Sequence, residues 1–238
     1  MPHADYDVDA LARYLHVAPG EVVKLAQRGT LPARRIGGAW RFAQAEIHHW
    51  LEERIGSADE LDLVKVQGLL DRAAQQTEPE TVRISELMPR EAIAIPLAAR
   101  TRNSVISAMT DLAAVTGLLW DAPQMAEAVK DRENLHPTAL DNGVALLHPR
   151  RPLGQILGQP LIALGRTQQG LPFGSAGGQL TDLFFLICSV DDSQHLRTLA
   201  RLSRLIAADE FVPALRVAAD AETVLVLVRQ YEELLDRA

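Results

Sequence analysis

The stretch LFFLICSV, residues 183–190, decides the fold class of this chain. An apolar run without polar alternation is typical of a β-strand that is covered on both faces. Around it, extended and helical patterns alternate along the sequence. Extended stretches occupy 92–96, 143–147 and 160–167, and helical patterns occupy 104–117, 122–134 and three segments toward the C-terminus. Strands that alternate with helices predict an α/β fold for this part of the chain.

The composition is that of an ordinary globular protein. Of the 238 residues, 47% are hydrophobic and 23% are charged, which excludes an intrinsically disordered chain. The length predicts one large domain or two modest ones. The single cysteine, Cys188, cannot form an intrachain disulfide and lies within the apolar run, so we expect a buried, unreactive thiol in a reducing compartment.

Targeting signals are not expected in this sequence. Every apolar stretch is broken before about 18 residues, which argues against a membrane span. The N-terminus, MPHADYDVDA, is acidic, whereas a signal peptide begins with a basic segment. We therefore expect a cytoplasmic protein that does not insert into a membrane.

The net charge of −7 is unevenly distributed along the chain. Residues 1–56 hold seven basic and seven acidic side chains, so the whole excess of negative charge belongs to residues 57–238. Within the first block, residues 22–45 carry five basic side chains and no acidic one. These five are Lys24, Arg28, Arg34, Arg35 and Arg41. Clustered cations of this kind are what phosphate binding requires, even though the average charge is acidic.

The segment at 57–80 is predicted to be a linker. It contains a short helical pattern with Ser57 as the N-cap, and it ends in QQTEPET, a polar stretch with a proline of the kind found at domain boundaries. The chain is therefore expected to form a small domain at 1–56 and a second domain at 81–238.

The first block has the pattern of a helix-turn-helix followed by a hairpin. Two short helices are predicted before Gly29, and LPARRIGGAWRF at 31–42 reads as two strands around Gly37-Gly38. EIHHWLEERI at 46–55 then closes the block as a helix. Adjacent histidines, such as His48-His49, point about 100° apart on a helix, so no metal site is expected there.

Residues 8–51 resemble the excisionase-type, MerR-like winged helix-turn-helix DNA-binding domain. The features that carry the resemblance are the G-x-L-P step from Gly29 to Pro32, the hairpin R-x-G-G-x-W-R-F, and the closing helix. The resemblance implies that the second helix lies in the major groove and that the hairpin, or wing, reaches phosphates or the neighbouring groove. The DNA-binding residues it implies are Lys24, Arg28, Arg34, Arg35, Trp40 and Arg41.

Two simpler interpretations of this block stay open. The arginines can form a solvated face, and Trp40 can pack the wing onto the helices. A domain of this kind can also bind a protein instead of DNA.

Three polar residues stand out in the second block. Arg132 lies at a predicted helix end, His148 follows a buried strand, and His195 lies in the first turn of a helix after the next strong strand. Side chains at strand ends are where α/β folds place their chemistry. A neutral imidazole can accept a phosphoryl group, and an arginine can bind the phosphoryl oxygens. The alternative is that both histidines are structural, with His195 serving only the helix end.

The segment RENLHPTALDNGVALLH, residues 132–148, resembles the signature of the fructose–mannitol type enzyme IIA domain, a family that includes nitrogen-regulatory members. The resemblance implies an α/β sandwich in which His148 is phosphorylated by the phosphocarrier HPr. It also implies that Arg132 steadies the phosphoryl oxygens and that His195 is the second histidine of the site. No cofactor and no metal are implied.

Four features near this signature bear on the site. The family usually has a proline before its histidine and a small residue after it, whereas this chain has Leu147 and Pro149. Pro149 has no backbone N–H to offer a phosphoryl group. His136 falls outside the matched position and is expected to be a loop histidine. The glycine-rich run at 168–178 lacks the spacing of a phosphate-binding loop and is expected to be a flexible surface loop near the site.

Together these patterns predict a DNA-binding transcriptional regulator whose enzyme IIA-like domain senses the phosphotransferase system through His148. The alternative is a phosphocarrier that passes its phosphoryl group to a permease or a regulatory target and uses the N-terminal domain for docking. Whether the second domain acts as a phosphotransferase enzyme stays open. A homodimer is possible because helix-turn-helix proteins commonly read paired half-sites.

Overall fold

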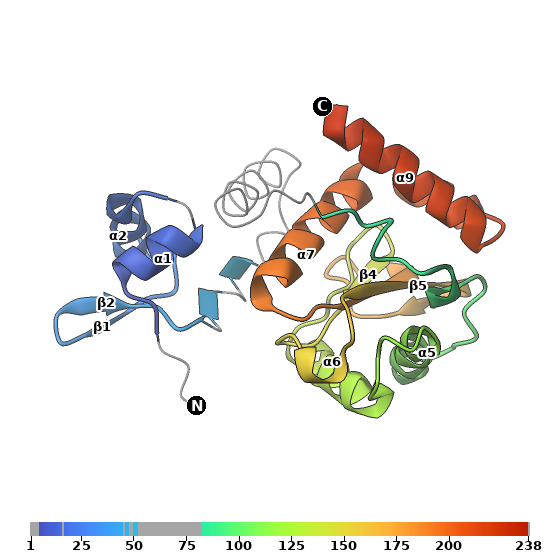
Figure 1. The fold of residues 1–238 in the computed structure, drawn as a ribbon, viewed down its shortest axis with the longest axis horizontal. Coiled ribbons are helices and arrows are strands. Elements are labelled where there is room, and N and C mark those ends of the chain that lie inside the picture. Colours follow the sequence, from blue (N-terminus) through green and yellow to red (C-terminus); the bar gives the residue numbers. More distant parts are fainter. Residues whose placement is uncertain (1–4, 16, 45, 48–49, 52–81, 238) are drawn as a thin grey trace. The chain divides into compact units, whose positions relative to one another are not determined.

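The computed structural model of the chain describes residues 5–15, 17–44, 46–47, 50–51 and 82–237. The chain divides into two compact units, Met1–Val82 and Arg83–Ala238 (Figure 1). The predicted linker at 57–80, with its helix after Ser57, and the His48-His49 pair lie outside the described residues.

The N-terminal unit contains the predicted helices and hairpin. Its elements are α1 (Val8–Leu15), α2 (Pro19–Gln27), β1 (Arg34–Ile36) and β2 (Ala39–Arg41). The two strands are antiparallel and are joined by Gly37 and Gly38, whose φ angles of 60° and 82° are accessible to glycine at little cost. These two glycines are therefore what allows the wing to turn in two residues.

The closing helix is held to the rest of the unit by buried apolar side chains and a hydrogen bond. The described residues of this helix are Gln44, Glu46, Ile47, Trp50 and Leu51, of which Ile47 and Leu51 are buried. The indole N–H of Trp50 donates a hydrogen bond to the carbonyl of Thr30, at 2.5 Å. The order helix, turn, helix, hairpin, helix that the sequence predicts is the order of this unit.

The C-terminal unit is built on one mixed four-stranded sheet. Its strands are β3 (Ile93–Ala94), β4 (Val144–Leu147), β5 (Leu161–Pro172) and β6 (Leu180–Cys188), in the order β3-β5-β6-β4. The β3–β5 and β4–β6 pairs are parallel, and β5 runs antiparallel to β6. Two short 3-10 turns, η1 (Arg90–Ala92) and η2 (Gly154–Ile156), precede β3 and β5.

Helices cover both faces of this sheet. The helices are α5 (Arg102–Val115), α6 (Ala122–Leu135), α7 (Asp192–Ala207), α8 (Phe211–Val217) and α9 (Ala221–Arg237). In Figure 1, α5 and α6 lie on one side of the strands, and α7 and α9 lie on the other. The predicted α/β fold is therefore confirmed, as a sheet between two layers of helices.

The apolar run at 183–190 explains why both faces need a cover. Phe184, Leu186 and Cys188 belong to the core that α5 and α6 share with the sheet, while the residues between them point to the opposite face. Every side chain from Leu183 to Cys188 is at most 1% exposed. Both faces of β6 are thus buried, as the absence of polar alternation predicts.

The prediction of a flexible surface loop at 168–178 is wrong for the first half of that run. Strand β5 continues to Pro172, and its pairing with β6 resumes at Leu171 after an irregularity that begins at Arg166. The second half is held by Asp141, whose carboxylate accepts hydrogen bonds from the Ser175 hydroxyl (2.6 Å) and from the Gly177 backbone N–H (2.7 Å). Sheet hydrogen bonding stabilises this segment in spite of its glycines.

Candidate functional site

His148 lies at the point where β4 ends. Its ring is buried, with 2% of the residue exposed, and its Nδ1 is 2.7 Å from the carbonyl oxygen of Leu146. A carbonyl can only accept a hydrogen bond, so Nδ1 carries the proton. In the neutral ring the lone pair is therefore on Nε2, which is the nitrogen that can act as a nucleophile.

His195 is brought to the same place by the helix that comes after β6. Asp191 caps α7, and its carboxylate accepts a hydrogen bond from the Gln194 backbone N–H at 2.9 Å. Because β4 and β6 are parallel neighbours, the residues directly after them meet at one edge of the sheet. The ring centroids of His148 and His195 are 5.1 Å apart, with the ring planes tilted by 47°. His195 is 5% exposed, so the pair is buried together.

Arg132 occupies the last turn of α6, as the sequence predicts. Its side chain is buried, and its Nη1 donates a hydrogen bond to the carbonyl of His136 at 2.7 Å. The segment after His136 runs beside β4, where the Thr138 carbonyl accepts a hydrogen bond from the Leu146 backbone N–H at 3.3 Å. Arg132 therefore lies in the segment that flanks the strand carrying His148. His136 itself is exposed, in agreement with the expectation of a loop histidine.

A buried carboxylate that no sequence pattern singled out organises this segment. Glu133 is 1% exposed and accepts hydrogen bonds from the backbone N–H of Thr138 (3.2 Å) and from the Thr138 hydroxyl. It also forms an ion pair with Arg102, at 3.1 Å. Glu133 and Thr138 both fall inside the signature at 132–148, and that position is the signal that could have pointed to them.

The two departures from the family signature have different consequences. Leu147 is fully buried and belongs to the core shared with α5 and α6, so a larger apolar residue fits where the family usually has proline. Pro149 supplies no N–H donor at the residue after His148. The next two residues, Arg150 and Arg151, are exposed cations.

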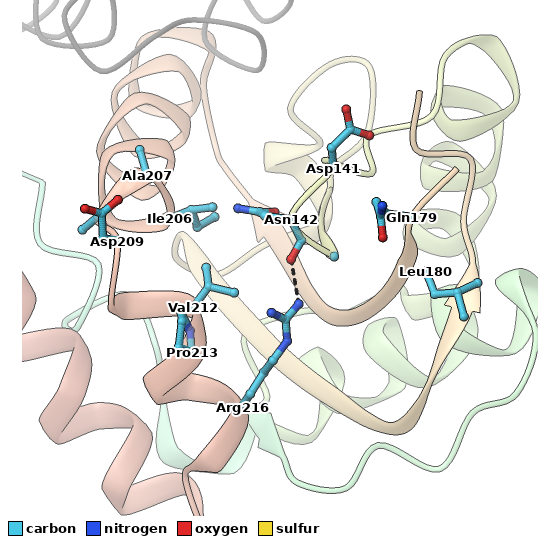
Figure 2. Close-up of a pocket in the computed structure, with 12 residues that line it drawn as sticks. Asp141, Asn142, Gln179, Leu180, Ile206, Ala207, Asp209, Val212, Pro213 and Arg216 are labelled. Atoms are coloured by element: carbon cyan, nitrogen blue, oxygen red, sulfur yellow. Dashed lines mark hydrogen bonds between the residues drawn. The ribbon is translucent and has the colours of Figure 1, made fainter. Parts of the chain in front are cut away.

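A cavity of about 570 Å³ lies where β4 and β6 begin (Figure 2). It is therefore at the opposite ends of these strands from the two histidines. Arg216 lines it and forms a two-point ion pair with Asp182, at 2.8 and 2.9 Å, while also donating to the Asn142 carbonyl at 2.6 Å. Asp141 also lines the cavity. Its carboxylate accepts hydrogen bonds from the Ser175 hydroxyl, which has the larger effect, and from the Gly177 backbone N–H, and both lower its pKa.

The basic residues of the N-terminal unit lie on two elements. Lys24 and Arg28 are exposed at the end of α2, and Arg34 and Arg35 are exposed on β1. The register of the wing places Arg34 directly opposite Arg41 on β2, so two like charges face each other across the hairpin. Such a pair destabilises a hairpin unless an anion lies nearby.

Two contacts restrain the wing side chains. The Arg34 guanidinium is 3.5 Å from the Asp5 carboxylate in a surface ion pair. The Arg35 guanidinium lies over the Trp40 ring, 4.8 Å from its centroid. Trp40 is half-buried, and its contact with Arg35 joins the two strands of the wing.

Two features were not found among the residues that the structure describes. No helix in these ranges is both long enough and apolar enough to cross a membrane. No group of three or more His, Cys, Asp or Glu side chains in these ranges is arranged to hold a metal ion.

Comparison with known proteins identifies relatives for both units. The profile of the phosphoenolpyruvate-dependent sugar phosphotransferase system EIIA 2 family matches residues 86–231, and a helix-turn-helix domain profile matches residues 6–55. A nitrogen regulatory protein from Bradyrhizobium diazoefficiens is 34% identical over 146 residues, which is 59% of this chain and 91% of the relative. The fructose-specific EIIABC component from Bacillus subtilis is 27% identical over 64% of this chain, but the match spans only 24% of that longer protein.

Solved structures show the same fold for the C-terminal unit. Nitrogen regulatory protein IIA-Ntr from Neisseria meningitidis aligns with a TM-score of 0.55 at 22% identity, over 61% of this chain and 98% of its own. The mannitol IIA protein from Escherichia coli aligns with a TM-score of 0.52 at 20% identity, over 59% and 98%. This chain therefore belongs to the EIIA 2 family of the phosphoenolpyruvate-dependent sugar phosphotransferase system, with a helix-turn-helix domain as its N-terminal unit.

Proposed function

We propose that this protein is a cytoplasmic, DNA-binding transcriptional regulator whose EIIA domain accepts a phosphoryl group on His148 and thereby senses the state of the phosphotransferase system. The observation that carries the proposal is the buried pair of imidazoles, with the His148 tautomer fixed by the Leu146 carbonyl. A histidine held in this way has its nucleophilic nitrogen defined before a donor arrives.

The transfer itself needs no proton movement at His148. The Nε2 lone pair forms the new N–P bond while the N–P bond of an HPr-like phosphohistidine donor breaks, and its electron pair returns to the donor nitrogen. The Nδ1 proton stays on the hydrogen bond to Leu146. Arg132 and His195 are the side chains suited to stabilise the phosphoryl oxygens, since both can donate charged or polarised N–H groups.

Phosphorylation at His148 is testable with purified components. Incubation with phosphoenolpyruvate, enzyme I and HPr is expected to give an acid-labile label on the wild-type protein. The His148→Ala variant is expected to take up no label, while His136→Ala, which removes an exposed loop histidine of the same domain, is expected to label normally. Undiminished labelling of His148→Ala contradicts the assignment.

DNA binding is supported by the charge arrangement of the N-terminal unit. Lys24 and Arg28 lie on the exposed surface of the second helix, where a helix-turn-helix contacts the major groove. Arg34 and Arg41 face each other across the wing, and Asp5 pairs with Arg34, so a phosphate beside the two arginines would supply a further anion for the facing cations.

This second half of the proposal is tested by binding to genomic fragments selected with the full chain. Arg34→Ala is expected to weaken binding and to lower the slope of log Kd against log salt by about 1, because one phosphate contact is lost. Arg13→Ala, which removes an exposed arginine of α1 outside the basic stretch, serves as the matched control. An unchanged salt slope for Arg34→Ala would contradict a phosphate contact by the wing.

A phosphocarrier role is the second candidate. It is favoured by the likeness to a fructose-specific EIIABC component of the phosphotransferase system, a longer protein of which the match spans 24%. The two candidates differ in the fate of the label. A carrier passes its label on to an EIIB domain and needs no DNA, whereas a regulator retains the label and binds specific duplexes.

A further inference from the structure

We infer that Ser189 is a positioning residue for the histidine pair: its hydroxyl donates a hydrogen bond to Nδ1 of His195, so that His195 carries its proton on Nε2. The two rings then present a lone pair on His148 and an N–H on His195. The inference rests on the proposed function, because an N–H on His195 beside the lone pair of His148 is useful only if His148 accepts a phosphoryl group.

The contact between Ser189 and His195 is buried and direct. Ser189 is 2% exposed, and its Oγ is 3.3 Å from Nδ1 of His195. It is the residue directly after Cys188, the last residue of β6, so its backbone is fixed by a strand that is buried on both faces. Nδ1 of His195 is the partner that the structure gives this buried hydroxyl, so removing the hydroxyl would leave the imidazole nitrogen without this hydrogen bond.

The turn between the two residues is held by its own hydrogen bonds. The Val190 backbone N–H donates to the Gln194 side-chain oxygen at 3.2 Å, and the Gln194 N–H donates to Asp191 at 2.9 Å. These bonds fix the start of α7 relative to the end of β6. Ser189 therefore meets His195 in one geometry and is not a surface hydroxyl that turns freely.

The choice of tautomer depends on the chemistry of the two partners. The Leu146 carbonyl can only accept, so it places the proton of His148 on Nδ1. A serine hydroxyl can donate or accept, so Ser189 permits either tautomer of His195. Only the donating orientation leaves Nδ1 of His195 as the acceptor and puts the proton on Nε2.

The donating orientation is the one that suits a phosphoryl group. If the Ser189 hydroxyl instead accepted a hydrogen bond from the Nδ1–H of His195, the Nε2 atoms of both rings would carry lone pairs, and a phosphoryl oxygen would face a second lone pair where it needs a donor. With Ser189 as the donor, His195 offers an N–H beside the nucleophile. The ring centroids are 5.1 Å apart, which places both rings within reach of one phosphoryl group.

The test reads the tautomer directly, before any phosphoryl donor is added. Imidazole nitrogen-15 spectra of the full chain are expected to show His195 with a protonated Nε2 and a lone-pair Nδ1. Ser189→Ala is expected to move His195 toward a mixture of tautomers, and Ser189→Thr, which keeps the hydroxyl, is expected to restore the wild-type spectrum. A wild-type spectrum with the proton on Nδ1 overturns the inference by itself, even if Ser189→Ala does not fold.

Ser203→Ala is the matched control. Ser203 lies on α7, the same helix as His195, and its buried hydroxyl makes no hydrogen bond within the part of the chain that the structure describes. Its removal is expected to leave the His195 spectrum unchanged. An equal shift in Ser189→Ala and Ser203→Ala would show a general loosening of α7 and would overturn the specific role of Ser189.

The rate of phosphoryl uptake provides the second measurement. Ser189→Ala is expected to label about tenfold more slowly than the wild type, because a residue that orients a site group acts through that group, and Ser189→Thr is expected to recover most of the rate. If the wild type takes no label, the proposed function fails while the spectra still decide the tautomer. If the wild type and Ser189→Ala label at equal rates, the positioning role is overturned and the proposed function stands.

Discussion

Glu133 shows at the scale of one residue how the segment before β4 is fixed. Its buried carboxylate joins three groups: the backbone and hydroxyl of Thr138 and the guanidinium of Arg102. A buried, charged carboxylate without such partners would be strongly unfavourable. The charge on Glu133 therefore depends on Thr138 and Arg102 being held in these positions.

We expect Glu133→Gln to lower the free energy of unfolding by about 2 kcal/mol, because the Arg102 ion pair is lost while the amide oxygen keeps one acceptor. The measurement is urea denaturation of the full chain, monitored at a signal of the C-terminal unit. Glu127→Gln, an exposed position on the same helix, is the control and is expected to change stability by less than about 0.5 kcal/mol. Equal stabilities for the two variants would show that the Glu133 cluster contributes nothing.

Cys188 gives a prediction with a defined pH range. Burial raises the pKa of its thiol from 9.0 to about 12. In the unfolded chain the thiol ionises above pH 9, while in the folded protein it stays protonated, so the unfolded state is favoured as the pH rises. The contribution is a loss of about 1.4 kcal/mol of stability for each pH unit between roughly 9 and 12.

This slope can be isolated with Cys188→Ala. The wild type and the variant are expected to differ in stability by a constant amount below pH 9, and the difference is expected to shrink as the pH rises above that value. Denaturant titrations at several pH values measure it. A parallel pH dependence of the two proteins up to pH 11 would contradict the burial of an ionisable thiol. In the native protein, thiol reagents are expected to react with Cys188 only on unfolding.

At the scale of secondary-structure elements, the turn before β4 depends on one glycine. Gly143 has a φ of +83°, and a Cβ at this position would lie 2.5 Å from Nη2 of Arg216 and 3.1 Å from the Leu180 carbonyl. Both the backbone conformation and the space therefore disfavour a side chain. We expect Gly143→Ala to destabilise the C-terminal unit by about 2 kcal/mol or more, measured by urea denaturation.

Gly20→Ala is the contrasting substitution, in the N-terminal unit. Gly20 lies in the first turn of α2, and a Cβ there would meet no atom within 4 Å. Alanine restricts the unfolded chain and favours the helix, so an increase in stability of up to about 0.5–1 kcal/mol is expected. A destabilised Gly20→Ala, or a neutral Gly143→Ala, would show that the two environments are wrongly described.

The sequence predicts elements better than it predicts how they pair. Helices and strands can be inferred from periodicity, and the continuous apolar run that begins at Leu183 correctly predicts a strand, buried on both faces as far as Cys188. The extension of β5 to Pro172 was missed because Gly170 and two glutamines weaken the local strand pattern, while the pairing with β6 that stabilises it is a long-range contact. The antiparallel β5–β6 pair in the sheet is likewise set by packing.

The candidate site divides in the same way. His148 and His195 could be predicted because each comes after a strand, and parallel strands bring their ends together. Ser189, Glu133 and Thr138 were missed as contributors because their importance comes from buried hydrogen bonds, which a sequence does not display. A histidine after a strand can be recognised in a sequence, whereas a buried hydrogen bond can be recognised only in the structure.

At the scale of the whole molecule, the charge of the two halves differs. The first 56 residues are balanced in charge, and the excess of acidic groups belongs to the rest of the chain. A phosphoryl group on His148 adds further negative charge to the acidic half. DNA is itself a polyanion, so an increase in negative charge on a DNA-bound protein raises the electrostatic cost of binding.

We therefore expect phosphorylation to weaken DNA binding by the full chain, by about fivefold or more at low salt and by less at high salt, because the added repulsion is screened. The measurement is fluorescence anisotropy with a selected duplex, in the presence of enzyme I and HPr, with and without phosphoenolpyruvate. His148→Ala is the control, since it is exposed to the same components but cannot be labelled at this position. A Kd that is the same for labelled and unlabelled wild type would separate phosphoryl acceptance from DNA binding, and would favour the phosphocarrier role for the C-terminal unit.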